Sequence, residues 1–228
     1  MTETKFSAEI FNAEIAIPGF NIFRQDRNFT LDRTKNQDDV STGGGSIIYI
    51  RDTLHANIIS SFDAPDSVAV HLSTTVGDIV IVCVYRTMSL NVAQDTALLN
   101  SLRKLCLANS SKEIFVVGDF NMPNVCWVTG TAPGSSNIVD EYLNVVTDSG
   151  LNWYITDEIT RRRLVNGVLQ ESTLDQFFCT NDSLINDFKI LSPIGNSDHM
   201  CILVEMDIDI VEKQDFINDS KQRWDKKK

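Results

Sequence analysis

The chain has 228 residues, of which 43% are hydrophobic and 22% charged, an ordinary globular composition that excludes a disordered, collagen-like or coiled-coil protein. Its net charge of −11 argues against a passive nucleic-acid-binding module, because like charges repel at long range, but it is compatible with a carboxylate cage for a cation. The longest apolar run, residues 79–85, is far shorter than the roughly 20 residues that span a bilayer, and no signal-peptide pattern opens the chain. We therefore expect an intracellular protein without a membrane segment.

Four short segments rich in β-branched residues predict β-strands, because each is bounded by Gly or Asp and fits the half-buried surface of a sheet. In chain order they are residues 46–51, 79–85, 113–117 and 201–206. Two segments between them predict helices. Residues 92–108 place three leucines on one stripe, and residues 138–147 have an apolar face that ends before Gly150. Interleaved strands and helices indicate an α/β domain of packed layers.

The most informative segment runs from residue 113 to residue 121, EIFVVGDFN. An apolar strand leads into Gly118, and Asp119 and Asn121 then flank Phe120. Residues two apart on an extended chain point to the same side, so a carboxylate and a carboxamide emerge together at the carboxyl end of a buried strand, where α/β sites usually lie. These oxygens suit a hard cation, a water or a phosphate group. The alternative is an ordinary polar turn, since Asp, Asn and Gly all favour turns.

Two further segments indicate an Asp–His dyad. Asp198 and His199 immediately precede the apolar segment 201–206, and Asp175 is the single acid in the apolar stretch STLDQFFC, residues 172–179. A carboxylate in such surroundings is costly to bury without a partner, and His199 is the natural one. A histidine oriented by a carboxylate can take a proton from water or stabilise developing charge. The alternative for Asp175 is an edge-strand aspartate that faces water.

Side chains that could contact phosphate lie in two places. Tyr85 and Arg86 stand at the end of the longest apolar run, where a phenol and a guanidinium can both donate to phosphate oxygens. Thr160 and Arg161 begin a segment with three consecutive arginines, residues 161–163, that could contact DNA. The alternatives are an ordinary strand-end pair in the first place and a solvated charge run in the second.

The order of these motifs resembles that of the endonuclease/exonuclease/phosphatase family, and the spacing is most similar to the apurinic-endonuclease-like domain of non-LTR retrotransposons. The motifs are GDFN, then STLD, then SDH before a strand, with a tyrosine-bearing strand upstream. Glu-Thr at residues 3–4 and the runs at residues 17–27 and 43–52 extend the similarity over nearly the whole chain. The resemblance implies an α/β fold: a four-layer sandwich of two mixed β-sheets flanked by helices, as in DNase I-like proteins.

The resemblance also assigns a role to each catalytic motif. The catalytic residues that it implies are Tyr85, Asp119, Asn121, Asp175 and His199. Asp119 and Asn121 match the acid and the amide of one motif, in which the acid is expected to activate or position the attacking water. Tyr85 is expected to contact the phosphate, and Asp175 to orient His199. Whether His199 or Asp119 takes the proton of the water stays open at this point.

A cation and a set of substrate contacts follow from the same resemblance. The metal carboxylates fall on Glu3 and Asp198, and the ion is usually Mg²⁺, with Mn²⁺ possible. Arg86, Thr160 and Arg161 are expected to bind the substrate. Glu3 stands almost at the terminus of the chain, where we expect a frayed end and therefore weak metal affinity.

The reaction that the resemblance implies is Mg²⁺-dependent hydrolysis of a DNA phosphodiester, which nicks one strand and leaves a 3′-hydroxyl to prime reverse transcription. The expected partner is DNA, the expected compartment is the nucleus, and the reverse transcriptase normally fused to such a domain is absent. One alternative is a catalytically impaired retrotransposon-derived remnant. Another is a family phosphatase or phosphodiesterase that acts on a non-nucleic-acid substrate.

We expect two parts along the chain. Residues 1–210 form the endonuclease/exonuclease/phosphatase domain, without the first strand and helix that the family places before the Glu-Thr pair. An asparagine-bearing motif of the family, which completes the metal and phosphate site, then has no counterpart. Residues 211–228 form a charged C-terminal tail.

Overall fold

The computed structural model describes residues 1–6, 9–27, 44–75, 77–87, 92–134 and 137–212; most of the expected tail therefore lies outside the described residues. The largest element is a six-stranded sheet in the order β3-β4-β5-β6-β10-β7. Its strands are β3 (Ala56–Ile58), β4 (Val68–Thr74), β5 (Gly77–Tyr85), β6 (Ile114–Asp119), β7 (Asn152–Trp153) and β10 (Asp175–Cys179). β5 and β6 are parallel and the other neighbours are antiparallel, so the sheet is mixed.

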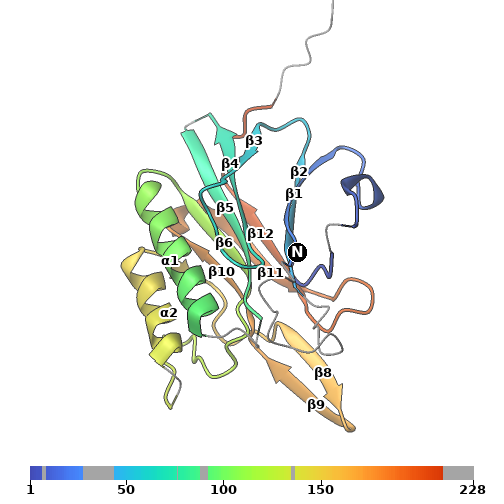
Figure 1. Cartoon of the computed structure of the whole chain (residues 1–228). Helices are drawn as coiled ribbons and strands as arrows, with labels where there is room; N and C mark the ends of the chain where they lie inside the picture. The colour runs from blue at the N-terminus through green and yellow to red at the C-terminus, as the bar shows by residue number, and fades with distance from the viewer. Residues whose placement is uncertain (7–8, 28–43, 76, 88–91, 135–136, 213–228) are drawn as a thin grey trace, which may run out of the picture.

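Two helices, α1 (Val92–Ala108) and α2 (Asn137–Asp148), cover one face of this sheet (Figure 1). The leucine stripe of α1 is buried, which confirms the periodicity that predicted this helix. It packs on side chains from one face of β5, such as Val80, Val82 and Val84, together with Phe120 and Tyr142. No helix among the described residues is long and apolar enough to cross a membrane.

A second core lies on the opposite face of the sheet. Ile79 on β5, Phe115 on β6 and Phe177 on β10 meet side chains of two antiparallel pairs there. One pair is β1 (Phe20–Gln25) with β2 (Ser46–Arg51), and the other is β11 (Ile185–Leu191) with β12 (Cys201–Met206). The fold is thus an α/β sandwich, as expected. In the described part of the chain, no α-helix covers the outer side of the two pairs.

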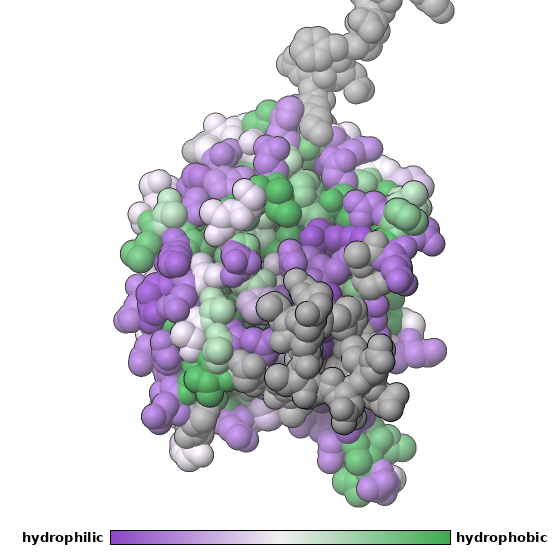
Figure 2. All heavy atoms as spheres, viewed as in Figure 1, coloured by the Kyte–Doolittle hydropathy of each residue, from purple (hydrophilic) through white to green (hydrophobic). Residues whose placement is uncertain are grey.

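A hairpin of β8 (Arg161–Val165) and β9 (Val168–Ser172) projects from the body of the molecule (Figure 1). Asn166 and Gly167 both have positive φ, the geometry of the tight turns that join such strands. The hairpin exposes Leu164, Val168 and Leu169, and Figure 2 shows this apolar tip in green below the body. The arginine triplet therefore lies on a strand.

The register of the main sheet brings three predicted site residues into one row. Tyr85 at the end of β5 pairs with Asp119 at the end of β6, and Asp119 pairs with Asp175 at the start of β10. The close approach of β6 to β5 depends on Gly118, because a Cβ there would lie 1.8 Å from the carbonyl oxygen of Val84. β6 can therefore continue to Asp119, two residues beyond the predicted strand end.

Candidate active site

His199 completes the row from a separate element. Its Nδ1 lies 2.8 Å from Oδ2 of Asp175, and its Nε2 lies 3.9 Å from Oδ2 of Asp119. The backbone holds the histidine in place, because Arg161 and His199 form an isolated bridge and the amide of Met200 donates to the carbonyl of Thr160 at 2.7 Å. The predicted Asp175–His199 pair is therefore present, and it faces Asp119.

Asp119 and Asn121 form a turn whose polar groups converge. Asn121 has φ +48, so the segment is not extended as the sequence analysis assumed. The amide of Asn121 donates to Oδ1 of Asp119 at 3.0 Å, and its side-chain Nδ2 donates to Oδ2 at 3.0 Å. Both interpretations of this segment therefore hold: the chain turns here, and the turn brings the carboxylate and the carboxamide together.

Burial and charge set the proton affinities of the two central groups. Burial, helped by the neighbouring carboxylates of Asp175 and Glu3, raises the pKa of Asp119 to about 7. Burial also opposes the charged form of His199, but the hydrogen bond and charge of Asp175, with Asp119 and Asp198, outweigh it and raise the histidine pKa. An acid that titrates near neutrality beside a stabilised imidazolium is typical of acid–base sites.

Tyr85 and Glu3 border the same centre. Burial, the exposed carboxylate of Glu3 and the charge of Asp119 together raise the pKa of Tyr85 to about 12, so its phenol keeps its proton. The segment around Glu3 is tied to the chain before and within β2: Thr2 bridges Ser46, and the amide of Lys5 donates to Gly44 at 2.9 Å. The expectation of a frayed end at Glu3 was therefore wrong, because it overlooked this pairing.

The acidic cluster could hold a cation. Asp119, Asp175 and His199 each offer one ligand atom, and these atoms lie within 4.8 Å of one another. Asp198, a predicted metal ligand, accepts from Nε of Arg161 through Oδ2 at 2.9 Å, while its Oδ1 lies 4.0 Å from Nε2 of His199. Partial burial opposes the charge of Asp198, but Arg161 outweighs it and lowers the carboxyl pKa.

Two predicted substrate contacts are corrected by the structure. The guanidinium of Arg86 is buried and bound to both carboxylate oxygens of Asp95, at 2.7 and 3.0 Å. Thr160 is fully buried, and its Oγ1 accepts from the amides of Leu174 and Asp175 at 2.9 and 3.0 Å. Both residues were wrong as substrate contacts, because their polar atoms are used inside the protein and are turned away from solvent.

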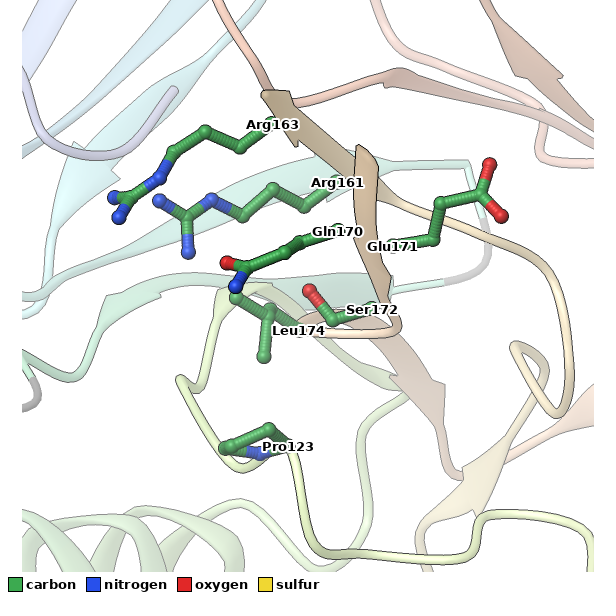
Figure 3. A pocket seen from close by; sticks show the side chains of 7 residues that line it. All are labelled: Pro123, Arg161, Arg163, Gln170, Glu171, Ser172 and Leu174. Atoms are coloured by element: carbon green, nitrogen blue, oxygen red, sulfur yellow. The ribbon is translucent and has the colours of Figure 1, made fainter. Parts of the chain in front are cut away.

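A pocket of about 390 Å³ adjoins the centre. It is lined by Pro123, Arg161, Arg163, Gln170, Glu171, Ser172 and Leu174. Figure 3 shows Arg161, Arg163 and Gln170 on one side of the hairpin, whereas Glu171 extends to the other side, where it accepts from Arg162 at 2.8 Å. Arg163 was predicted only as a member of the arginine triplet and Gln170 was not predicted, although the alternation of a hairpin around Asn-Gly could have placed the two on one face.

Comparisons with known proteins agree with this geometry. The family model described as endonuclease-reverse transcriptase matches residues 79–203, more than half of the chain. That range includes Tyr85, Asp119, Asp175 and His199 but not Glu3. No curated protein sequence matches the chain.

Three solved structures illustrate the folds that this chain resembles. The endonuclease domain of TRAS1, a telomere-specific non-LTR retrotransposon, is 19% identical with a TM-score of 0.65, over 83% of this chain and 81% of that one. The 3′-5′ exonuclease from Neisseria meningitidis is 15% identical with a TM-score of 0.58, over 90% and 87%. The human Nocturnin catalytic domain is 15% identical with a TM-score of 0.52, over 91% and 79%. These matches show the expected endonuclease/exonuclease/phosphatase fold.

Proposed function

The chain belongs to the endonuclease-reverse transcriptase family, and on that premise we propose that it is a divalent-metal-dependent DNA endonuclease that hydrolyses a phosphodiester bond and nicks one strand. The observation that carries the proposal is the position of His199 between Asp175 and Asp119, with Nδ1 bound to one carboxylate and Nε2 facing the other. Tyr85 borders this centre, and Arg161 and Arg163 line the pocket beside it.

The donor set fits a hard cation. Burial together with two neighbouring carboxylates makes the negative charge of Asp119 costly, and a cation would relieve that cost. We assign the ion to the carboxylates of Glu3 and Asp198, beside Asp119, because the resemblance of the Glu-Thr and Ser-Asp-His motifs implies these two ligands. Mg²⁺ is the proposed ion and Mn²⁺ a substitute, since both prefer oxygen ligands. When bound, the ion supplies positive charge against the phosphate oxygens.

The residues of the chain divide the remaining work. Asp119, with a pKa of about 7, accepts the proton of the attacking water, and Asn121, which donates to both carboxylate oxygens of Asp119, holds that carboxylate in place. His199, kept protonated more readily by Asp175, stabilises the negative charge that builds on the phosphate. Tyr85 keeps its proton and donates to a phosphate oxygen. We therefore propose Asp119, rather than His199, as the general base.

The hairpin and pocket support DNA as the substrate. Arg161 and Arg163 place positive charge next to the catalytic centre of a chain whose net charge is −11. Guanidinium groups pair well with phosphate oxygens, and the Gln170 amide can both donate and accept. The related TRAS1 structure is an endonuclease domain of a retrotransposon, which supports nicking for retrotransposition as the role of residues 1–210, ahead of the tail. Reverse transcriptase is then the expected partner, and the nucleus the expected compartment.

A second candidate is removal of a terminal 3′-phosphate. A related structure is titled as a 3′ phosphatase from Neisseria bound to a product DNA hairpin, with 14% identity and a TM-score of 0.57 over 90% of this chain and 87% of that one. Covalently closed plasmid and a 3′-phosphorylated oligonucleotide, each with Mg²⁺, separate the two activities. Nicking of the plasmid without release of inorganic phosphate supports the endonuclease, and phosphate release without nicking supports the second candidate.

A further inference from the structure

Arg86 lies buried where β5, α1 and the turn after β6 meet. Its Nε and Nη2 donate to the two carboxylate oxygens of Asp95 in the first turn of α1. Its Nη1 donates to the carbonyls of Phe120 and Asn121, at 3.3 and 3.2 Å. One guanidinium therefore joins a helix to the turn that presents the catalytic carboxylate and carboxamide.

The backbone of Arg86 binds the same turn from its other side. Its amide donates to the carbonyl of Asp119 at 2.8 Å, and its carbonyl accepts from Nδ2 of Asn121, also at 2.8 Å. Arg86 thus contacts three consecutive residues of the turn. The second proton of the Asn121 carboxamide goes to Asp119 at 3.0 Å, so the orientation of that side chain depends on both neighbours.

We infer that Arg86 and Asp95 are positioning residues for the pair Asp119–Asn121: the buried ion pair holds the turn in the geometry that aims the carboxylate and the carboxamide. This inference rests on the proposed function only in that it takes Asp119 and Asn121 to be catalytic. Asn121 has φ +48, a left-handed conformation that asparagine tolerates better than most residues with a side chain and that turns the chain sharply after Asp119. The carbonyls of Phe120 and Asn121 on this turn are the ones that Arg86 binds.

The chemistry requires an arginine at this position. The planar guanidinium spans a carboxylate with one edge and reaches two carbonyls with the remaining nitrogen, whereas a lysine ammonium is a point charge without that fork. Arg86→Lys would keep the charge opposite Asp95 and lose the contacts to Phe120 and Asn121. This substitution therefore tests the contacts to the turn while an ion pair with Asp95 is retained.

The kinetic test compares Arg86→Lys with Leu102→Ala. Leu102 lies on α1, as Asp95 does, but its buried side chain belongs to the core between helices and sheet, so its loss should destabilise the protein without altering the turn. We expect kcat for plasmid nicking to fall about tenfold to a hundredfold in Arg86→Lys, since a misplacement of this kind is felt in the chemical step. The KM for DNA should stay within about twofold. Leu102→Ala should lose thermal stability and keep its kcat well below its unfolding temperature. An Arg86→Lys variant that keeps kcat overturns the inference.

A second measurement does not need activity. In ¹⁵N-labelled protein, the side-chain amide signals of Asn121 should move in Arg86→Lys and stay unchanged in Leu102→Ala; unmoved signals in Arg86→Lys overturn the inference. If the Asn121 signals move in Arg86→Lys but even the unsubstituted chain does not nick DNA, the proposed function is wrong and the positioning by Arg86 stands. Should Arg86→Lys not fold, Asp95→Asn, which keeps the shape of the side chain, takes its place with the same two readouts.

Discussion

Nδ1 of His199 lies 2.8 Å from Oδ2 of Asp175, although the two residues are 24 positions apart: Asp175 begins β10 and His199 lies just before β12. Asp175 opens β10, so its position is set by pairing with Asp119 on β6. His199 is held instead by backbone bonds to the base of the β8–β9 hairpin. The dyad therefore couples the central sheet to the element that we propose contacts DNA.

The first prediction concerns this dyad. Asp175→Asn removes the charge and replaces the charged acceptor by a weaker, neutral one, so the pKa of His199 should fall and less imidazolium should remain near neutrality. We expect kcat to drop by about a hundredfold or more, as when the orienting acid of a catalytic histidine is removed. The alkaline limb of the pH–rate profile should move to lower pH. Proton NMR of the histidine signals checks the shift directly, with His55 and His71 as internal references.

A His199 pKa that is the same in Asp175→Asn as in the unsubstituted chain would contradict this prediction. It would mean that the short contact does not control the proton affinity of the histidine. Loss of activity without a pKa change would then have to come from altered packing around the base of β10.

The second prediction concerns stability in the absence of metal. The pKa of Asp119 rises from 3.8 to about 7 on folding, so between these values the folded state retains a proton that the unfolded state has released. The free energy of unfolding should therefore fall as pH rises through this range. His199 acts in the same direction: its raised pKa stabilises the fold below the unfolded value, and this contribution is lost as pH rises past the folded value. Urea unfolding in EDTA should show a loss of a few kcal/mol between about pH 5 and about pH 8.

Asp119→Asn should flatten that pH dependence and be the more stable protein at about pH 8, because it removes a carboxylate that is costly to ionise. Asp63→Asn, at an exposed aspartate, is the control and should follow the unsubstituted chain. If the free energy of unfolding changes equally with pH in Asp119→Asn and Asp63→Asn, Asp119 is not the source of the pH dependence.

The third prediction concerns the metal ligand near the terminus. Mg²⁺ at millimolar concentration should raise the unfolding temperature of the unsubstituted chain, because an ion that binds only the folded state stabilises it. Glu3→Gln should lose most of this stabilisation. Glu205→Gln, which removes an exposed carboxylate on β12, should retain it. Identical Mg²⁺ titrations for Glu3→Gln and Glu205→Gln would remove Glu3 from the site.

The fourth prediction uses the two faces of the hairpin. Arg163 lines the pocket, whereas Arg162 pairs with Glu171 on the other face. Arg163→Ala should raise the KM for DNA about fivefold and reduce the salt dependence of binding by about one phosphate contact. Arg162→Ala is the matched control and should change the KM little. Equal effects of the two substitutions would show that the pocket face has no special part in binding.

Much of this architecture could be predicted from local patterns. The strands at residues 46–51 and 201–206 and the helix at residues 92–108 have the predicted bounds. In the helix the spacing of the leucines matches their burial. The dyad was also predicted, since Asp175 is an acid in an apolar strand and needs a partner. The strands and the helix are marked within a few neighbouring residues, whereas the dyad joins two such local signals that lie 24 positions apart.

What the sequence analysis missed depends on contacts between distant segments. Arg86 was interpreted as a phosphate contact because nothing in its own strand reveals that α1 brings Asp95 to its guanidinium. Thr160 was likewise predicted to bind the substrate, but its hydroxyl oxygen accepts hydrogen bonds from the amides of Leu174 and Asp175, which lie more than ten positions along the chain. The anchoring of Glu3 requires pairing across more than forty positions, as in the bridge between Thr2 and Ser46, and no periodicity within residues 1–6 could reveal it.

The most direct test of the central claim is nicking of covalently closed plasmid by the unsubstituted chain and by His199→Ala, each with Mg²⁺ and with EDTA. We predict nicking by the unsubstituted chain with Mg²⁺ only, and a loss of activity of at least about a hundredfold in His199→Ala. Folded, unsubstituted protein that leaves the plasmid closed with Mg²⁺, or nicking that persists unchanged in His199→Ala, would contradict the account.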